Sequence, residues 1–212
     1  METNINLQNL DEKAIIDAIK TGTTTVAIMY KDGVVIGTES QATAGYTIAS
    51  KQAQKLFEIN KYTAATISGG VADCQYVVNQ IQALSRLKEI HKGKTPDPKY
   101  IANITRNLLF SGRSYFLSMM IVGGYSKKEA KGKLYGIDLL GALFEEKTFL
   151  SYGSGSPFSL GVLEADWKPN MSREEAINLV KTAISSSRER DAASGFKLQI
   201  CVINKDGFQK VE

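Results

Sequence analysis

The chain has 212 residues, of which 43% are hydrophobic and 23% charged, and its formal net charge is +4. This length and composition suit one globular domain and exclude an intrinsically disordered chain. No apolar run approaches the roughly 20 residues that a membrane span needs, and the first residues lack the basic and apolar regions of a secretory signal. We therefore expect a cytoplasmic protein with no membrane partner.

The two cysteines, Cys74 and Cys201, lie far apart in the sequence. Neither belongs to a cluster with metal-ligand spacing, so free buried thiols in a reducing compartment are expected, and no metal or cofactor. The densest basic stretch, residues 127–133, contains a glutamate and has no aromatic or glycine-rich recognition motif. A solvated turn is therefore expected there, and nucleic acid is not expected as a partner.

A leader is predicted at residues 1–22. Its apolar residues follow a short helical pattern, which ends at Thr21-Gly22. This segment suits either a frayed terminal helix or a removable pro-segment.

A β-hairpin is predicted next, from β-branched runs at 23–30 and 34–40. The three residues between them end in Gly33, which is expected in the left-handed conformation. If Tyr30 pairs with Val34, four polar side chains face the same side of the sheet. A one-residue change in loop length would move Glu39 to the opposite face. These are Thr23, Thr25, Glu39 and Gln41.

The remaining elements fall into blocks of strands and blocks of helices. Strands are predicted at 42–50, 55–59, 62–68, 116–125, 134–140, 142–150, 197–203 and 208–211. Helices are predicted from Gly70 to about His91, after Pro96 and Pro98, over 158–167, and over 171–190 with a capping box at Ser172 and Glu175. This order predicts an α+β fold with two antiparallel sheets packed face to face and helices outside.

Histidine-based catalysis is not supported. The single histidine, His91, ends a predicted helix among lysines and a glycine, where a third group to orient it is not expected. The stretch GSGSP at 153–157 lacks the lysine of a phosphate-binding loop and is expected to be a turn.

The Gly22–Thr23 junction offers chemistry that needs no histidine. A free α-amine has a pKa near 7.7–8.0, close to that of a good general base at neutral pH. If the chain is cut before Thr23, this residue supplies both a hydroxyl nucleophile and an amine base. Gly22 has no side chain to obstruct attack on its carbonyl.

From Thr23 to nearly its end, the chain resembles β subunits of the proteasome core particle, above all the archaeal ones, which are N-terminal-nucleophile hydrolases. The matching motifs are GTTTVA at 22–27, KDGVVIGTE at 31–39, KLF at 55–57, SGGVADCQ at 68–75, GSGSPFSLGVLE at 153–164 and RDAASG at 190–195. The resemblance implies a four-layer αββα sandwich. It also implies two parts, a pro-segment at 1–22 that is removed on maturation and a hydrolase domain at 23–212.

The resemblance also implies roles for individual residues. Thr23 would be the nucleophile, cleaved from Gly22 autocatalytically, with Glu39 and Lys55 as charged partners. The Gly69 amide would form the oxyanion hole, and the network around the Thr23 amine would comprise Ser154, Asp191 and Ser194. Taken singly, each of these except Thr23 also suits an ordinary turn, cap or surface position.

For substrate, the resemblance implies that Thr43 pairs with the peptide backbone. The first side-chain pocket would be lined by Ala42, Ala53, Ile67, Val71 and Gln75, with Lys55 at its base. This lining is mostly neutral and apolar, so cleavage after large apolar residues is expected. The chain departs from the family at Glu39, where most members have aspartate, at Ser40 and Gln41, which are often basic, and in its longer leader.

The implied function is that of a threonine endopeptidase subunit that degrades unfolded polypeptides. Its partners would be proteasome α subunits and other β subunits in heptameric rings of a four-ring barrel, with a regulatory ATPase bound through the α rings. One alternative is an unprocessed, non-catalytic β-ring subunit with a role in assembly. A third possibility is a related threonine hydrolase of the bacterial two-ring type.

Overall fold

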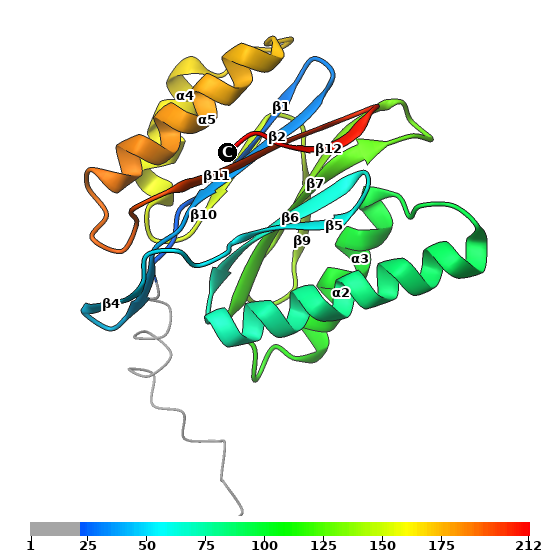
Figure 1. Cartoon of the computed structure of the whole chain (residues 1–212), viewed down its shortest axis with the longest axis horizontal. Helices are drawn as coiled ribbons and strands as arrows, with labels where there is room; N and C mark the ends of the chain where they lie inside the picture. Colours follow the sequence, from blue (N-terminus) through cyan, green and yellow to red (C-terminus); the bar gives the residue numbers. More distant parts are fainter. Residues whose placement is uncertain (1–21) are drawn as a thin grey trace, which may run out of the picture.

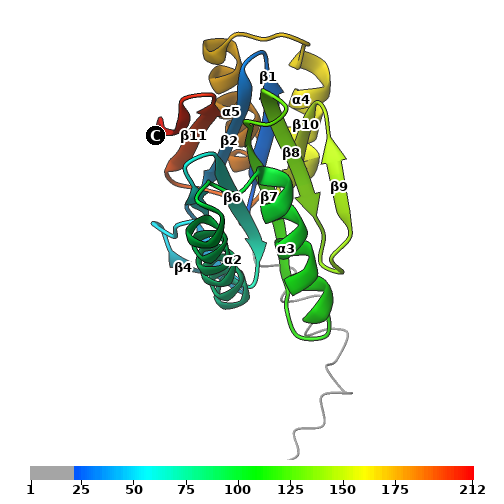
Figure 2. The ribbon, with the colours of Figure 1, turned by 90° about the vertical axis from the view of Figure 1, so that its right-hand side faces the viewer.

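The computed structural model describes residues 22–212, so the predicted leader helix lies outside the described residues. Two five-stranded antiparallel sheets pack face to face, and two helices cover the outer face of each (Figures 1 and 2). This is the α+β arrangement of helix, sheet, sheet and helix layers that the sequence predicts. Within the described residues, no helix is both long and apolar enough to cross a membrane.

The first sheet contains the predicted hairpin at its centre. Its order is β10 (Phe149–Tyr152), β1 (Thr25–Tyr30), β2 (Gly33–Glu39), β11 (Leu198–Asn204) and β12 (Gly207–Lys210). Every residue of β2 is buried, because one face of the strand meets the helices and the other meets the second sheet. The hairpin therefore lies in the interior of the molecule.

The second sheet follows the chain as a meander. Its order is β5 (Leu56–Asn60), β6 (Thr63–Gly69), β7 (Ser118–Ser126), β8 (Lys131–Ile137) and β9 (Leu143–Glu146). A separate two-stranded hairpin, β3 (Ala42–Ala44) and β4 (Thr47–Ser50), projects from the edge of the sandwich (Figure 1).

The four helices pack in two pairs. Helices α2 (Val71–Lys92) and α3 (Pro98–Ser111) cover the second sheet, while α4 (Ser156–Asp166) and α5 (Arg173–Arg188) cover the first. The capping box predicted at the start of α5 is confirmed, since the Ser172 hydroxyl accepts from the Glu175 amide and the Glu175 carboxylate accepts from the Ser172 amide. The start of that helix is therefore defined by local sequence.

Three apolar clusters hold the layers together. One lies between the second sheet and its helices, one between the first sheet and its helices, and one between the two sheets. Cys74 belongs to the first cluster and Cys201 to the third, and both are buried free thiols, as predicted. Burial raises the pKa of the Cys74 thiol to about 11.

The predicted register of the central hairpin is wrong by one residue. The turn has two residues, so Tyr30 pairs with Gly33 and Thr25 pairs with Thr38. Gly33 does not adopt the left-handed conformation. Glycine is needed there because the backbone of Ile203 approaches closely, and a Cβ on Gly33 would lie 2.0 Å from the Ile203 carbonyl oxygen. Thr25 and Glu39 therefore do not face each other.

The stretch predicted as one strand at 142–150 is also different. It folds as β9 and β10, which join different sheets: β9 pairs with β8 and β10 pairs with β1. The chain crosses from one layer to the other between them.

Candidate active site

The Gly22–Thr23 peptide bond enters a buried polar site just before β1. Only 3% of Thr23 is exposed, and its hydroxyl donates to the Gly22 carbonyl oxygen at 2.6 Å. The Lys55 ammonium donates to the Thr23 hydroxyl at 2.9 Å and to the same carbonyl at 3.4 Å. The predicted nucleophile, lysine and scissile carbonyl therefore lie together.

Lys55 is paired with Glu39 inside the protein. Its Nζ lies 2.5 Å from Glu39 Oε1, and the two side chains are 3% and 0% exposed. Burial lowers the pKa of Lys55 from its ordinary 10.5, and the opposing charge and hydrogen bond of Glu39 act against that shift. The ammonium beside Thr23 is therefore compensated by a carboxylate and poised to stabilise negative charge on the hydroxyl oxygen.

Backbone amides hold Glu39 in place, which the sequence did not reveal. Oε1 accepts from the Thr24 amide at 3.2 Å, and Oε2 accepts from the amides of Gln41 at 2.6 Å and Gly195 at 3.1 Å. With Lys55, these donors engage both carboxylate oxygens and keep the buried charge satisfied.

A second polar network approaches Thr23 from the other side. The Thr23 nitrogen, here part of the peptide bond, donates to Ser154 Oγ at 3.2 Å. The hydroxyls of Ser154 and Ser194 each donate to Asp191 Oδ2 at 2.6 Å. The three residues predicted around the Thr23 nitrogen are thus brought together, from the turn before α4 and the loop after α5.

Thr24 connects the two networks. Its hydroxyl lies 2.7 Å from Ser194 Oγ, while its amide contacts Glu39 as described. Gln199 is a further residue that sequence reasoning missed. Its side-chain oxygen accepts from the Lys55 amide at 3.0 Å and its nitrogen donates to the Ala53 carbonyl at 2.7 Å, so β11 positions the segment that carries Lys55.

Glycines let the backbone close around the junction. Gly153 has φ +101°, and a Cβ there would lie 1.9 Å from the Thr23 carbonyl oxygen. A Cβ on Gly155 would lie 1.9 Å from Thr24 Oγ1, and one on Gly22 would lie 1.6 Å from Ala193 Cβ. The GSGSP stretch therefore borders the site, as the role that the family resemblance gives to Ser154 implies.

Gly69 ends β6 at the same end of the sandwich. Its φ of +119° and its contact with Leu117, whose oxygen would lie 2.2 Å from an added Cβ, both require glycine. The preceding Ser68 hydroxyl would lie 3.1 Å from a Cβ on Gly153. Gly69, which is expected to stabilise an oxyanion, therefore follows a residue that lies beside the GSGSP turn.

The residues predicted to contact substrate differ in how far they are exposed. Thr43 and Ala42 are half-buried on β3, and the Thr43 hydroxyl accepts from the Gly22 amide at 3.1 Å. Ile67 is buried in the core, although its amide donates to the Lys55 carbonyl at 3.1 Å. The half-buried positions Ala53 and Val71 and the exposed Gln75 complete the set.

Comparison with known proteins agrees with this architecture. The proteasome subunit family matches residues 19–203. The proteasome subunit beta of Methanocaldococcus vulcanius is 42% identical over 195 residues, covering 92% of this chain and 86% of the relative. That of Methanocaldococcus jannaschii is 41% identical over 198 residues, covering 93% and 88%.

A more distant relative matches over a similar length. The proteasome subunit beta 2 of Aeropyrum pernix is 37% identical over 204 residues, covering 96% of this chain and 90% of the relative. These matches span nearly the whole fold, including both polar networks around Thr23. The chain therefore belongs to the proteasome subunit family, as a β subunit of the archaeal type.

Proposed function

We propose that this β subunit is a threonine endopeptidase of the proteasome core particle. The observation that carries the proposal is the contact between Lys55 Nζ and Thr23 Oγ1 at 2.9 Å, with Glu39 compensating the lysine inside the protein. A buried ion pair beside a hydroxyl is costly to maintain for structure alone, but it suits activation of a nucleophile.

The first reaction is release of residues 1–22 as a pro-segment, leaving 23–212 as the mature domain. The Thr23 hydroxyl oxygen attacks the Gly22 carbonyl carbon, the bond from that carbon to the Thr23 nitrogen breaks, and the hydroxyl proton is transferred to the departing amine. Water then hydrolyses the resulting ester. The products are the Gly22 carboxylate, a free Thr23 hydroxyl and a free α-amine.

In the mature subunit the same groups act on a peptide substrate. The α-amine of Thr23 takes the hydroxyl proton, the oxygen attacks the substrate carbonyl, and the amine then protonates the leaving nitrogen. Ser154, Asp191 and Ser194 hold the amine, Lys55 stabilises the charge on the Thr23 oxygen, and the Gly69 amide stabilises the developing oxyanion. Water releases the acyl group and restores the enzyme.

Intact-mass analysis of the assembled particle tests this function. Wild-type chains should lose Met1–Gly22 and turn over fluorogenic peptides. Thr23→Ala should retain the leader and be inactive, whereas Thr23→Ser, which keeps a hydroxyl, should be processed. Wild-type chains that stay full length in a complete particle would instead indicate the non-catalytic, assembly role.

For assembly we propose heptameric rings of this and other β subunits, in contact with α rings that connect to a regulatory ATPase. Unfolded polypeptides in the cytoplasm would be the substrates. Native mass spectrometry of the chain with its α partner should show a multi-ring particle, and monomer alone would contradict this.

For specificity we propose cleavage after large apolar residues, in a pocket formed by Ala42, Ala53, Ile67, Val71 and Gln75. Thr43 would pair with the substrate backbone as in strand addition. A peptide library with an assembled, active particle checks this, and a preference for acidic or basic residues would contradict it.

A further inference from the structure

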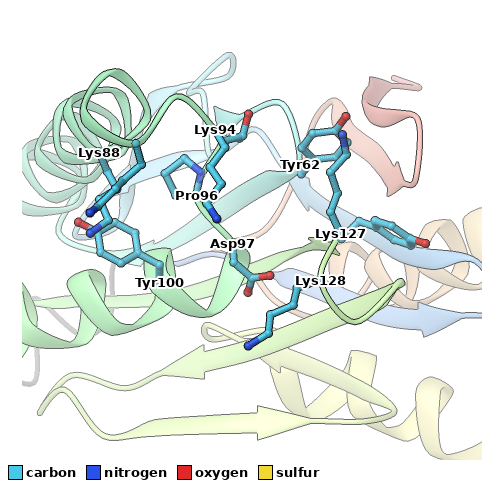
Figure 3. Close-up of a pocket in the computed structure, with 11 residues that line it drawn as sticks. Tyr62, Lys88, Lys94, Pro96, Asp97, Tyr100, Lys127 and Lys128 are labelled. Carbon is cyan, nitrogen blue, oxygen red and sulfur yellow. The ribbon is translucent and has the colours of Figure 1, made fainter.

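A cavity of about 470 Å3 lies at the end of the sandwich away from Thr23. Figure 3 shows the residues that line it. It is open to solvent and is lined by the last turns of α2, the connection to α3, the residue before β6, the end of β7 and the turn after β7. Tyr62 borders this cavity just before β6, and Gly69 ends the same strand at the candidate active site. At about 3.3 Å per residue, these two residues are about 23 Å apart.

Lysines dominate the charge of this cavity. Five line it, and none forms an ion pair with another residue in the 22–212 range: Lys88, Lys92, Lys94, Lys127 and Lys128. Two of these lysines lie over tyrosine rings. Lys88 Nζ lies 5.0 Å from the Tyr100 ring centre and Lys127 Nζ lies 4.4 Å from that of Tyr62.

Asp97 is the acidic residue among the described residues of the lining, and it forms no ion pair with these lysines. Asp97 caps α3, and its Oδ1 accepts from the Lys99 amide at 3.0 Å while its Oδ2 accepts from the Ser126 hydroxyl. The nearby Glu89 accepts a hydrogen bond from the Thr95 hydroxyl at 2.5 Å. Glu129, in the turn after β7, is paired with Lys131 and Lys133. Among residues 22–212, the lysines around the cavity therefore have no carboxylate as an ion-pair partner.

The arrangement of the lysines suits an anion with several charged groups. Figure 3 shows Lys88 and Tyr100 on one side, Tyr62 and Lys127 on the other, and Lys94, Pro96 and Asp97 between them. The volume lies within the range of small-molecule sites, and lysine ammonium groups bind phosphates as compact point charges. Lys88 is half-buried, whereas the other four lysines are exposed and accessible to an anion from solvent.

We propose that this cavity binds a small compound carrying several phosphate groups, independently of the peptidase site. Two sources share this chemistry, an inorganic phosphate chain and the phosphate tail of a nucleotide. The lysines recognise the phosphates in either case.

Isothermal titration calorimetry on the full-length chain tests this, with tripolyphosphate, ATP and citrate as separate probes. We expect saturable binding of tripolyphosphate, ATP or both, at one site per chain, weakening as salt is raised. Equal binding of the two would identify the phosphate chain as the ligand, and binding of ATP alone would identify a nucleotide. Citrate, a carboxylate of similar charge, should bind at least about tenfold more weakly, since it lacks tetrahedral phosphates.

The variant Lys88→Gln/Lys127→Gln should weaken phosphate binding by at least about tenfold, because each lysine contributes a charged hydrogen bond. Lys168→Gln, an exposed lysine beyond α4, is the matched control and should leave affinity unchanged. The proposal is overturned if neither phosphate probe binds, if citrate binds as tightly, or if the double variant and the control behave alike.

Discussion

At the residue scale, the space around Gly22 constrains the peptide bond between Gly22 and Thr23, at which we propose cleavage. A Cβ at this position would lie 1.6 Å from Ala193 Cβ, and 2.6 Å from both the Cα and the carbonyl oxygen of Ala193. Gly22→Ala should therefore push the carbonyl away from Thr23 and slow leader release by about 100-fold, since a misplacement of about 1 Å has that effect on reacting groups. A time course of intact mass during assembly measures the rate.

The matched variant for this prediction is Gly22→Ala with Ala193→Gly. It removes the Cβ that lies nearest, so it should recover part of the lost rate. The two backbone contacts remain, and full recovery is not expected. Processing of Gly22→Ala at the wild-type rate would show that this contact does not position the carbonyl.

The buried pair of Glu39 and Lys55 gives a second prediction at this scale. Glu39→Gln leaves the lysine without its carboxylate in an environment from which water is excluded. We expect the free energy of unfolding to fall by about 3 kcal/mol, as for other buried pairs that lose one partner, and leader release to stop. Chemical denaturation and intact mass measure the two effects.

Glu174→Gln is the control for the loss of one carboxylate. Its 3.8 Å pair with Arg173 is exposed, so the change should stay within about 1 kcal/mol. A Glu39→Gln chain as stable as this control would mean that Lys55 loses its proton without cost when the carboxylate is removed.

At the element scale, the turn between β7 and β8 contains a pH-sensitive contact. Hydrogen bonds from Lys133 and Lys131 lower the pKa of Glu129 from 4.5 to about 2. Between these pH values the unfolded chain binds more protons at this site than the folded chain does. The stabilising effect of Glu129 is therefore complete above pH 4.5 and is lost as the pH falls toward 2.

Melting temperatures of wild type and Glu129→Gln at several pH values test whether the stabilising effect of Glu129 is lost as the pH falls. Wild type should melt higher at pH 6, and the difference should shrink steadily below pH 4.5. The effect should be small, because the carboxylate is partly exposed and screened by water. A difference that grows on acidification would contradict the assignment of the lysines as its cause.

At the scale of the whole molecule, the distance between the two sheets depends on small residues. A Cβ on Gly123 of β7 would lie 2.6 Å from Ile36 Cδ1 and 3.1 Å from Val34 Cγ1, both on β2. Gly123→Ala should therefore overpack the interface and lower the free energy of unfolding by about 1–3 kcal/mol. Denaturant titration measures it.

Gly161→Ala is the same chemical change as Gly123→Ala, but we expect it to raise the free energy of unfolding. This glycine is exposed within α4, and an added Cβ would meet no heavy atom within 4 Å. The substitution should stabilise the protein by up to about 1 kcal/mol through helix propensity. If Gly123→Ala is as stable as wild type or more stable, packing between the sheets is not limited by Gly123.

Local patterns in the sequence were enough for most elements. The capping box at Ser172 and Glu175, the prolines before α3 and the apolar runs of β1 and β2 act through neighbouring residues, so they are readable one segment at a time. The order of strand and helix blocks then predicted the layers. Motifs at Thr23, Glu39 and Lys55 indicated the candidate site through family resemblance.

Tertiary structure decided what depends on distant segments. The hairpin register follows a two-residue turn and the approach of Ile203 to Gly33, and the segment from 142 to 150 divides between sheets because each half finds a different partner strand. The amide donors to Glu39 come from the residue before β1, the segment after β2 and the loop after α5, and backbone amides carry no side-chain signature. Sequence alone therefore determined which groups are available for chemistry, whereas packing determined which of them meet, because contact between distant segments is set by the layers and not by local propensity.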